Sequence, residues 1–431
     1  MNSKPALNMT IRRPDAAWQW NCRSRVSSVD MVRPTRTVAV AAVALLLVGL
    51  PWLADARVSD VWYIGLEADM SSGTAEAGQA IKRGTELAIE EINAAGGLLG
   101  RSLKLLVRDN RGNPARGVDN ILEYGAIEDV IAVMGGLHTP VLLPELPLLH
   151  EHALITLVPW AAGTAVVDNG YSPNFVFRVS VRDELAGGVM IEEGLRRGCS
   201  CFGLLLERTG WGRSNEQAIH ASVSGHETAV VAGTNWFDWG AVDLIASVQD
   251  LYEKGADCLV LVANPREGKL AIDAASRYGL QKGITPVVLS HWGITGGGVR
   301  FYESVSHLLD QVDLSFIQSF SFFNPRYPEK AQRFFEKYAS RYPNITGLKD
   351  IHSAPGTAQA YDLVHLLALA VTQAQTTDSE SVLHALENLP PHDGLIKRYE
   401  PAFTSQRHDA LGINSLEMYR YRGDGAIVPV R

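Results

Sequence analysis

Residues 61–109 read VWYIGLEADMSSGTAEAGQAIKRGTELAIEEINAAGGLLGRSLKLLVRD, and this stretch decides the fold. The apolar run 61–66 predicts a buried strand. Residues 78–95 carry apolar side chains at helical spacing and end at a glycine pair, which predicts an amphipathic helix with a glycine stop. A second strand is predicted over 103–108. Strand, helix and strand in this order indicate a right-handed unit with parallel strands.

The same alternation continues along the chain. In a first module, strands are predicted over 61–66, 103–108, 130–134 and 154–158, with helices over 78–95, 114–124 and 140–152. After a turn-rich break at 171–174, a second module has helices over 184–197, 214–224, 242–254 and 267–278 and strands over 202–206, 228–231, 258–262 and 286–289. Helices over 328–341, 357–373 and 379–389 and strands over 416–421 and 426–430 follow. We therefore expect an α/β fold of two doubly wound parallel-sheet lobes joined by a hinge.

The first 56 residues do not fit either module. Arg33 and Arg36 precede an apolar run over 38–50, and Ala54-Asp55-Ala56 follows it. This order is typical of a secretory signal, and the run is shorter than the roughly 20 residues that span a bilayer. We expect residues 1–56 to be leader and signal peptide, with Met31 as the true start, and the mature protein to be periplasmic. An uncleaved membrane anchor is the alternative.

The charge balance argues against a nucleic-acid partner. Residues 1–56 hold seven basic and three acidic residues, which leaves 32 basic and 44 acidic residues and a formal net charge of −12. No basic stripe remains after residue 56. An acidic surface keeps a protein soluble and repels nucleic acid.

Three cysteines remain after residue 56, and an odd number gives no disulfide framework. Cys199 and Cys201 lack zinc-site spacing, so we interpret all three as small apolar residues at strand starts, with a Cys201–Cys258 bridge as the alternative. His138 and His291 lie on loops at strand ends, but no nucleophile motif surrounds them. The sequence therefore predicts no catalytic residue, metal or cofactor.

In open α/β sheets, ligands bind beyond the carboxyl ends of the strands. Here those ends carry residues 69–73, 135–139, 160–164, 207–212, 263–265 and 290–293. Several of these loops lead directly into helices, whose free N–H groups attract carboxylates and phosphates. The 135–139 loop adds a hydroxyl, and the 160–164 loop adds a hydroxyl and an indole.

Residues 64–109, 135–144, 157–164, 211–212, 361–371 and 418–429 together resemble the branched-chain amino acid-binding protein family. These are type I periplasmic binding proteins that serve ABC transporters, and the resemblance covers essentially the whole chain after Ala56. It implies that the chain passes between the lobes three times, near 175–180, 320–323 and 395–402. The first lobe would comprise 57–176 plus 322–394, and the second 177–321 plus 395–431.

The resemblance also implies a ligand site. Thr139 matches a hydroxyl that holds the ligand carboxylate, and Ala162 stands where a threonine is expected, with Thr164 close by. Trp211 matches the aromatic residue that closes over the ligand, and Asn264 replaces a tyrosine. The expected ligand contacts are His138, Thr139, Trp160, Ala161, Ala162, Thr164, Trp211, Asn264, His291 and Trp292.

One departure concerns ligand identity. The acidic residue that receives the ligand ammonium in the family is matched by Trp292, which accepts no hydrogen bond. A buried ammonium without a carboxylate costs several kcal/mol. We therefore expect a carboxylate or amide with a flat or apolar body, such as an aromatic acid. Two alternatives remain: a cationic ligand on the aromatic rings with help from Glu67 or Glu207, and tryptophans that only fill the core between the lobes.

The resemblance implies a binding protein rather than an enzyme. The expected function is the extracytoplasmic solute-binding component of an ABC-type importer, with a small molecule and a membrane permease as partners. The alternative is a ligand-sensing receptor or regulator of the same fold.

Overall fold

The computed structural model describes residues 60–351 and 353–430. The predicted leader and signal peptide, residues 1–56, lies outside the described residues. Within them, no helix combines the length and the apolar character needed to cross a bilayer.

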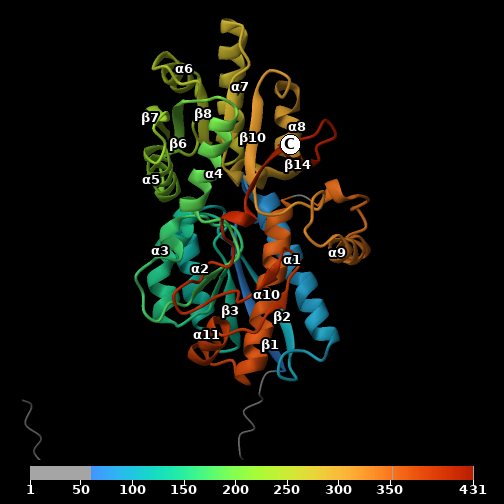
Figure 1. Cartoon of the computed structure of the whole chain (residues 1–431). Coiled ribbons are helices and arrows are strands. Elements are labelled where there is room, and N and C mark those ends of the chain that lie inside the picture. Colours follow the sequence, from blue (N-terminus) through green and yellow to red (C-terminus); the bar gives the residue numbers. More distant parts are fainter. Residues whose placement is uncertain (1–59, 352, 431) are drawn as a thin grey trace, which may run out of the picture. The chain divides into compact units, whose positions relative to one another are not determined.

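The first lobe is built on a five-stranded, fully parallel sheet in the order β2-β1-β3-β4-β5. Its helices α1, α2 and α3 connect successive strands (Figure 1). Its strands are β1 (Val61–Ala68), β2 (Ser102–Asp109), β3 (Val130–Met134), β4 (Thr156–Val158) and β5 (Val176–Arg178), and the helices are α1 (Ala75–Ala94), α2 (Pro114–Gly125) and α3 (Thr139–Glu151).

The second lobe repeats this order in a seven-stranded sheet, β14-β13-β10-β9-β8-β6-β7. In this sheet β13 runs antiparallel to both of its neighbours, β10 and β14. Its strands are β6 (Cys201–Glu207), β7 (Val230–Phe237), β8 (Cys258–Val262), β9 (Val287–Ser290), β10 (Asp313–Gln318), β13 (Glu417–Tyr421) and β14 (Ile427–Pro429). Its helices are α4 (Asp183–Arg196), α5 (Gly210–Ser224), α6 (Ile245–Glu253), α7 (Pro265–Lys282) and α8 (Gly298–Val305).

After β10 the chain returns to the first lobe through α9 (Pro328–Arg341), α10 (Ala354–Ala374) and α11 (Ser379–Glu387). A short hairpin follows, made of β11 (His392–Asp393) and β12 (Arg398–Tyr399). Helices α1 and α10 lie side by side although they are far apart in the sequence (Figure 1). A Cβ at Gly84 of α1 would lie 2.1 Å from the carbonyl oxygen of Thr357 in α10, so only glycine permits this close contact.

The predicted fold class, two doubly wound parallel-sheet lobes, is confirmed. Two local assignments differ from the structure. Helix α8 and strand β10 were missed, because no helix or strand was predicted between residues 289 and 328. Strand β7 runs over Val230–Phe237 rather than 228–231, since its second half has polar residues that lower its apparent strand character. Strand β5, Val176–Arg178, completes the first sheet, and the chain then enters α4 of the second lobe at Asp183.

The disulfide joins Cys199 to Cys258, and Cys201 is free. The alternative bridge from Cys201 was therefore wrong, and the interpretation of all three as small apolar residues at strand starts was wrong for Cys199 and Cys258, which pair. Phe202 pairs with Cys258 across β6 and β8, so these two side chains share one face of the sheet. Cys201, one residue earlier, points to the other face, while Cys199 precedes the strand and is not bound by this alternation.

The segment that leads from α11 to β13 contacts both lobes. The N–H of Arg178 in β5 donates to the carbonyl of His408, and the N–H of Ala410 donates to the carbonyl of Arg178. This segment thereby extends the edge of the first sheet before it enters β13 of the second.

Candidate functional site

Each of the two sheets has a topological switch point next to its first strand. In each sheet the first strand, β1 or β6, lies between the second and the third, so the connections leave it in opposite directions. Such a switch point opens a crevice beyond the carboxyl ends of the strands. The loops that follow β1, β3, β6 and β8 are therefore the expected walls of a ligand site.

A cavity of about 260 Å³ lies where loops of the two lobes face each other. First-lobe residues after β1, β2 and β3 form one wall, and second-lobe residues after β7 and β8 form the other. The side chains that matter most for its chemistry are Asp69, Thr74, Arg111, His138, Trp239, Asn264, Arg266 and Glu267. Two of the ten predicted contacts, His138 and Asn264, are among them.

The first-lobe wall is held by Asp69. Its carboxylate accepts hydrogen bonds from the N–H groups and hydroxyls of Ser72 and Thr74 at 2.6–3.0 Å. Although burial opposes them, these bonds lower the pKa of Asp69. His138 Nε2 lies 2.8 Å from the Thr74 hydroxyl, and burial lowers the pKa of His138 to about 4. This imidazole is neutral near pH 7 and lends no positive charge to the cavity.

Beneath this wall, the carboxyl groups of Glu67 and Glu145 are buried. Asn110 donates to Glu67 at 2.5 Å and accepts from the N–H of Gly112 on the cavity surface. Burial raises the pKa of Glu67 to about 7. Burial and the neighbouring charge of Glu67 raise the pKa of Glu145. The pair therefore holds a proton at neutral pH.

The second-lobe wall is held by Glu207, at the end of β6. Its Oε2 accepts from Trp239 Nε1 at 2.9 Å and from Asn264 Nδ2 at 3.0 Å, and its Oε1 accepts from the Thr209 hydroxyl at 2.6 Å. Burial raises the pKa of Glu207 to about 7. This one carboxyl group thus fixes two cavity-lining side chains that come from different loops.

Four predicted residues form a closed aromatic layer between the lobes. The rings of Trp160 and Trp292 lie 5.2 Å apart, and those of Trp211 and His291 lie 4.9 Å apart and perpendicular. All four side chains are buried. Trp160 comes from the first lobe and the other three from the second, so the layer joins the lobes directly.

Asp183, the first residue of α4, lies within this layer. Trp211 Nε1 donates to its Oδ1 at 3.1 Å, and His291 Nε2 lies 3.1 Å from the same oxygen. Its Oδ2 is buried and has no hydrogen-bond partner among the described residues. A buried carboxylate oxygen without a partner is costly, which makes Asp183 a candidate acceptor for an N–H or O–H group, although it does not line the cavity.

Two first-lobe loops that were predicted to hold the ligand, 135–139 and 160–164, are joined by a hydrogen bond. The N–H of Gly163 donates to Thr139 Oγ1 at 3.0 Å, which leaves the hydroxyl proton of Thr139 free to donate. The N–H of Thr164 donates to Ser214 Oγ in the second lobe at 3.1 Å. Ala161 and Ala162 are buried beside them. Of the ten predicted residues, four therefore form the aromatic layer, two line the cavity, and the other four, Thr139, Ala161, Ala162 and Thr164, lie on these two connected loops.

The sequence pattern did not predict Asp183, Trp239 or Arg178 as residues of the site. An acidic residue at a helix start is usually a capping residue, so Asp183 carried no separate signal. Trp239 follows β7, whose end was placed too early. Arg178 lies in the short β5, and only the pairing of β5 with the C-terminal segment reveals its role.

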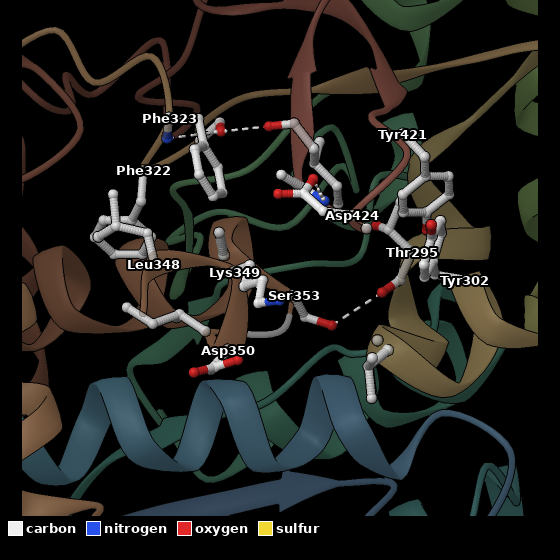
Figure 2. Close-up of a pocket in the computed structure, with 18 of the residues that line it drawn as sticks. Thr295, Tyr302, Phe322, Phe323, Leu348, Lys349, Asp350, Ser353, Tyr421 and Asp424 are labelled. Carbon is white, nitrogen blue, oxygen red and sulfur yellow. Dashed lines mark hydrogen bonds between the residues drawn. The ribbon is translucent and has the colours of Figure 1, made fainter. Parts of the chain in front are cut away.

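A second cavity of about 260 Å³ lies between α8, the β13–β14 turn and residues 348–351 and 353–354 (Figure 2). Tyr302, Tyr421 and Phe322 line it, and Ser353 Oγ donates to the Thr295 carbonyl at 3.0 Å. None of the ten predicted contacts lines this cavity.

One group of side chains in the described residues has metal-like spacing, namely Cys199, Asp257 and Cys258. Its two cysteines are joined in the disulfide, so neither offers a thiolate. The described residues therefore provide no fitting metal site there.

Comparison with known proteins agrees with this architecture. A family model described as periplasmic binding protein matches residues 61–426. The Leu/Ile/Val-binding protein homolog 3 of Brucella melitensis is 25% identical over 386 residues, which is 87% of this chain and 95% of that protein.

Solved structures share the fold at lower identity. A periplasmic binding protein type 1 from Bordetella pertussis superposes with a TM-score of 0.76 at 21% identity, covering 86% of this chain and 100% of that one. A solute-binding protein of an ABC transporter from Rhodopseudomonas palustris was solved in complex with 4-hydroxybenzoate. It superposes with a TM-score of 0.70 at 16% identity, covering 86% of this chain and 95% of that one. Because the family model spans nearly all of residues 60–430, the chain belongs to the periplasmic binding protein family, as its resemblance to the branched-chain amino acid-binding members predicts.

Proposed function

We propose that this protein is the extracytoplasmic solute-binding component of an ABC-type importer. It binds a small carboxylate or amide between its lobes and delivers it unchanged to a membrane permease, in the periplasm. The observation that supports this most is the cavity at both switch points, with one wall from each lobe.

The proposed division of the chain is 57–176 plus 322–394 for the first lobe and 177–321 plus 395–431 for the second, except that Phe177 and Arg178 complete β5 of the first sheet. A ligand that contacts both lobes stabilises the closed form, and only that difference in affinity shifts the population. The permease then distinguishes the closed protein from the open one. The ten residues of the predicted site are the proposed ligand contacts.

The polar groups at the lobe boundary suit a ligand with an acidic end and a flat body. Arg111 and Arg266 bring one guanidinium from each lobe to the cavity, where His138 is uncharged. Trp239 offers an aromatic wall. Asp183 supplies an acceptor that the sequence comparison did not find, so a hydroxylated aromatic acid and an amino acid both have a partner for their donor. The relative from Rhodopseudomonas palustris was solved with the first kind of ligand, and the Brucella relative is named for the second.

The test is calorimetric titration of residues 57–431 with leucine, benzoate, 4-hydroxybenzoate and benzamide. We expect saturable binding of at least one, weakened about tenfold by Arg266→Gln for the acids and less for benzamide, since one charged hydrogen bond is lost. Arg277→Gln is the matched control, because Arg277 lies on the same helix and pairs with Asp273 on its exposed side. Tight binding of leucine with none of benzoate-like acids would reject an aromatic acid, and binding of none of a wider panel would reject the proposal.

A further inference from the structure

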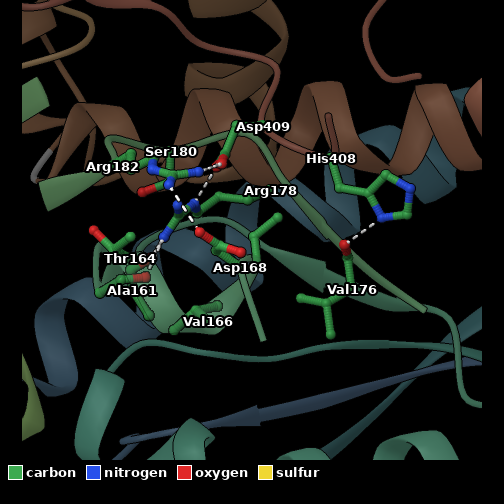
Figure 3. Close-up of polar contacts among 12 residues, drawn as sticks. Ala161, Thr164, Val166, Asp168, Val176, Arg178, Ser180, Arg182, His408 and Asp409 are labelled. Atoms are coloured by element: carbon green, nitrogen blue, oxygen red, sulfur yellow. Dashed lines mark hydrogen bonds and ion pairs between the residues drawn. The ribbon is translucent and has the colours of Figure 1, made fainter. Parts of the chain in front are cut away.

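Arg178 is a completely buried arginine whose side chain reaches the 160–164 loop of the first lobe (Figure 3). Its Nη1 donates to the carbonyl of Gly163 at 2.8 Å and to the carbonyl of Ala161 at 3.2 Å. These two residues flank Ala162, so one guanidinium holds the loop on both sides of a proposed ligand contact. Nη1 serves both carbonyls, and the planar guanidinium leaves Nε to donate on its other side, a spread of donors that one ammonium nitrogen cannot reproduce.

The guanidinium is itself fixed from the opposite side. Its Nε donates to Asp409 Oδ1 at 2.5 Å, and Arg182 Nη1 lies 3.4 Å from the other oxygen of Asp409. Asp409 belongs to the segment between α11 and β13, which pairs with β5. Arg182 lies on the connection from β5 to α4. Figure 3 shows Arg178 between the Asp409 side and the Ala161 side of this network.

The ligand loop carries contacts whose geometry depends on this anchor. Besides the two carbonyls held by Arg178, the N–H of Gly163 donates to Thr139, the carbonyl of Ala162 accepts from the N–H of Asp183, and the N–H of Thr164 donates to Ser214. Without Arg178 the buried carbonyl of Ala161 would lose its donor, and the carbonyl of Gly163 would keep only the N–H of Val166, so the loop would be held less firmly at these two points.

We propose that Arg178 is a positioning residue of the ligand site: it fixes the Ala161–Gly163 backbone, and Asp409 sets its orientation from a segment that joins the two lobes. Movement of that segment during opening is thereby transmitted to the loop that contacts the ligand. The contact to ligand rests on the proposed function, but the positioning of the loop does not.

The loop's order is measured by hydrogen–deuterium exchange on residues 57–431 without any ligand. We compare Arg178→Lys and Asp409→Asn with Asp168→Asn, the matched control, because Asp168 pairs with Arg182 on the exposed side of the network and does not contact Arg178. The amides of Ala161, Gly163 and Thr164 should exchange about tenfold faster in the first two variants, since a charged hydrogen bond is lost. In the control variant the exchange rates of these amides should stay within about twofold of the parent protein, and so should those of α7 in all variants.

Unchanged exchange at the loop in both variants overturns the proposal. So does an equal rise throughout the protein, or failure of both variants to fold, because Arg178 would then be a general stability residue. A second measurement uses 4-hydroxybenzoate and leucine. If the parent protein binds either, Asp409→Asn should weaken it about tenfold. If the parent binds neither, the proposed ligand class fails, while the exchange result still decides the positioning.

Discussion

Replacing Gly163 by alanine tests the contact between the 160–164 loop and the 135–139 loop of the first lobe. A Cβ built at Gly163 would lie 2.4 Å from Thr139 Cγ2 and 3.0 Å from Thr139 Oγ1, so the methyl group of Thr139 is the main obstacle. Gly163 has φ of −49°, which alanine adopts without strain. The clash alone should lower the free energy of unfolding by about 2 kcal/mol.

The obstacle can be removed without losing the hydroxyl. Thr139→Ser deletes Cγ2 and should cost about 1 kcal/mol, close to one buried methyl group. In the double variant the new Cβ occupies the space of the lost methyl, so its cost should be close to that of Thr139→Ser alone. Urea unfolding of the four proteins gives the coupling, which we expect at about 1–2 kcal/mol. Additive costs, about 3 kcal/mol for the double variant, would refute the packing of these two loops.

Three further predictions follow from burial and charge. Trp292→Ala should lower the free energy of unfolding by about 3–5 kcal/mol, because its buried ring packs on the first lobe, and a urea-measured loss below about 1 kcal/mol would contradict this. Glu67 has its pKa raised to about 7 in the folded protein, so it binds a proton that the unfolded chain releases near 4.5, and stability should fall as pH rises from about 5 to 8. Glu67→Gln should flatten that slope in urea unfolding, and an unchanged slope would show that Glu67 does not contribute to it. Reducing agent should lower stability by about 2–4 kcal/mol through the Cys199–Cys258 bridge, and equal thermal melts with and without reductant would contradict it.

Most of the fold was predictable because its elements are periodic. Helix α1 and strands β1, β3 and β8 lie where the apolar pattern put them, since each buries one face or both in a regular way. Strand β10 was missed because its apolar residues are interrupted by Ser315 and flanked by Asp313 and Gln318.

The positions of the candidate-site residues in the fold were predictable at the level of loops. Strand ends meet at one edge of a parallel sheet, so Thr139, Trp160 and Asn264 could be placed from their order alone. Side-chain partners could not. The bonds from Trp239 and Asn264 to Glu207 depend on loops that are far apart in the sequence and carry no shared pattern.

The same limit applies to the buried ionic groups. Arg178 and Asp409 are separated by 231 positions, and their pairing follows from the last segment lying along β5. Glu67 and Glu145 come from β1 and α3, and each alone has the sequence character of an ordinary surface carboxylate. Distant pairs of this kind become visible only when the tertiary contacts are known.

The most direct test is a crystal structure of residues 57–431 with the tightest-binding compound of the titration panel. We predict that the compound lies between the lobes, in contact with Thr139 or Thr164 on one side and with Trp211 or Asn264 on the other. A compound that binds on the outer face of one lobe, or in the cavity of Figure 2 alone, would contradict the account.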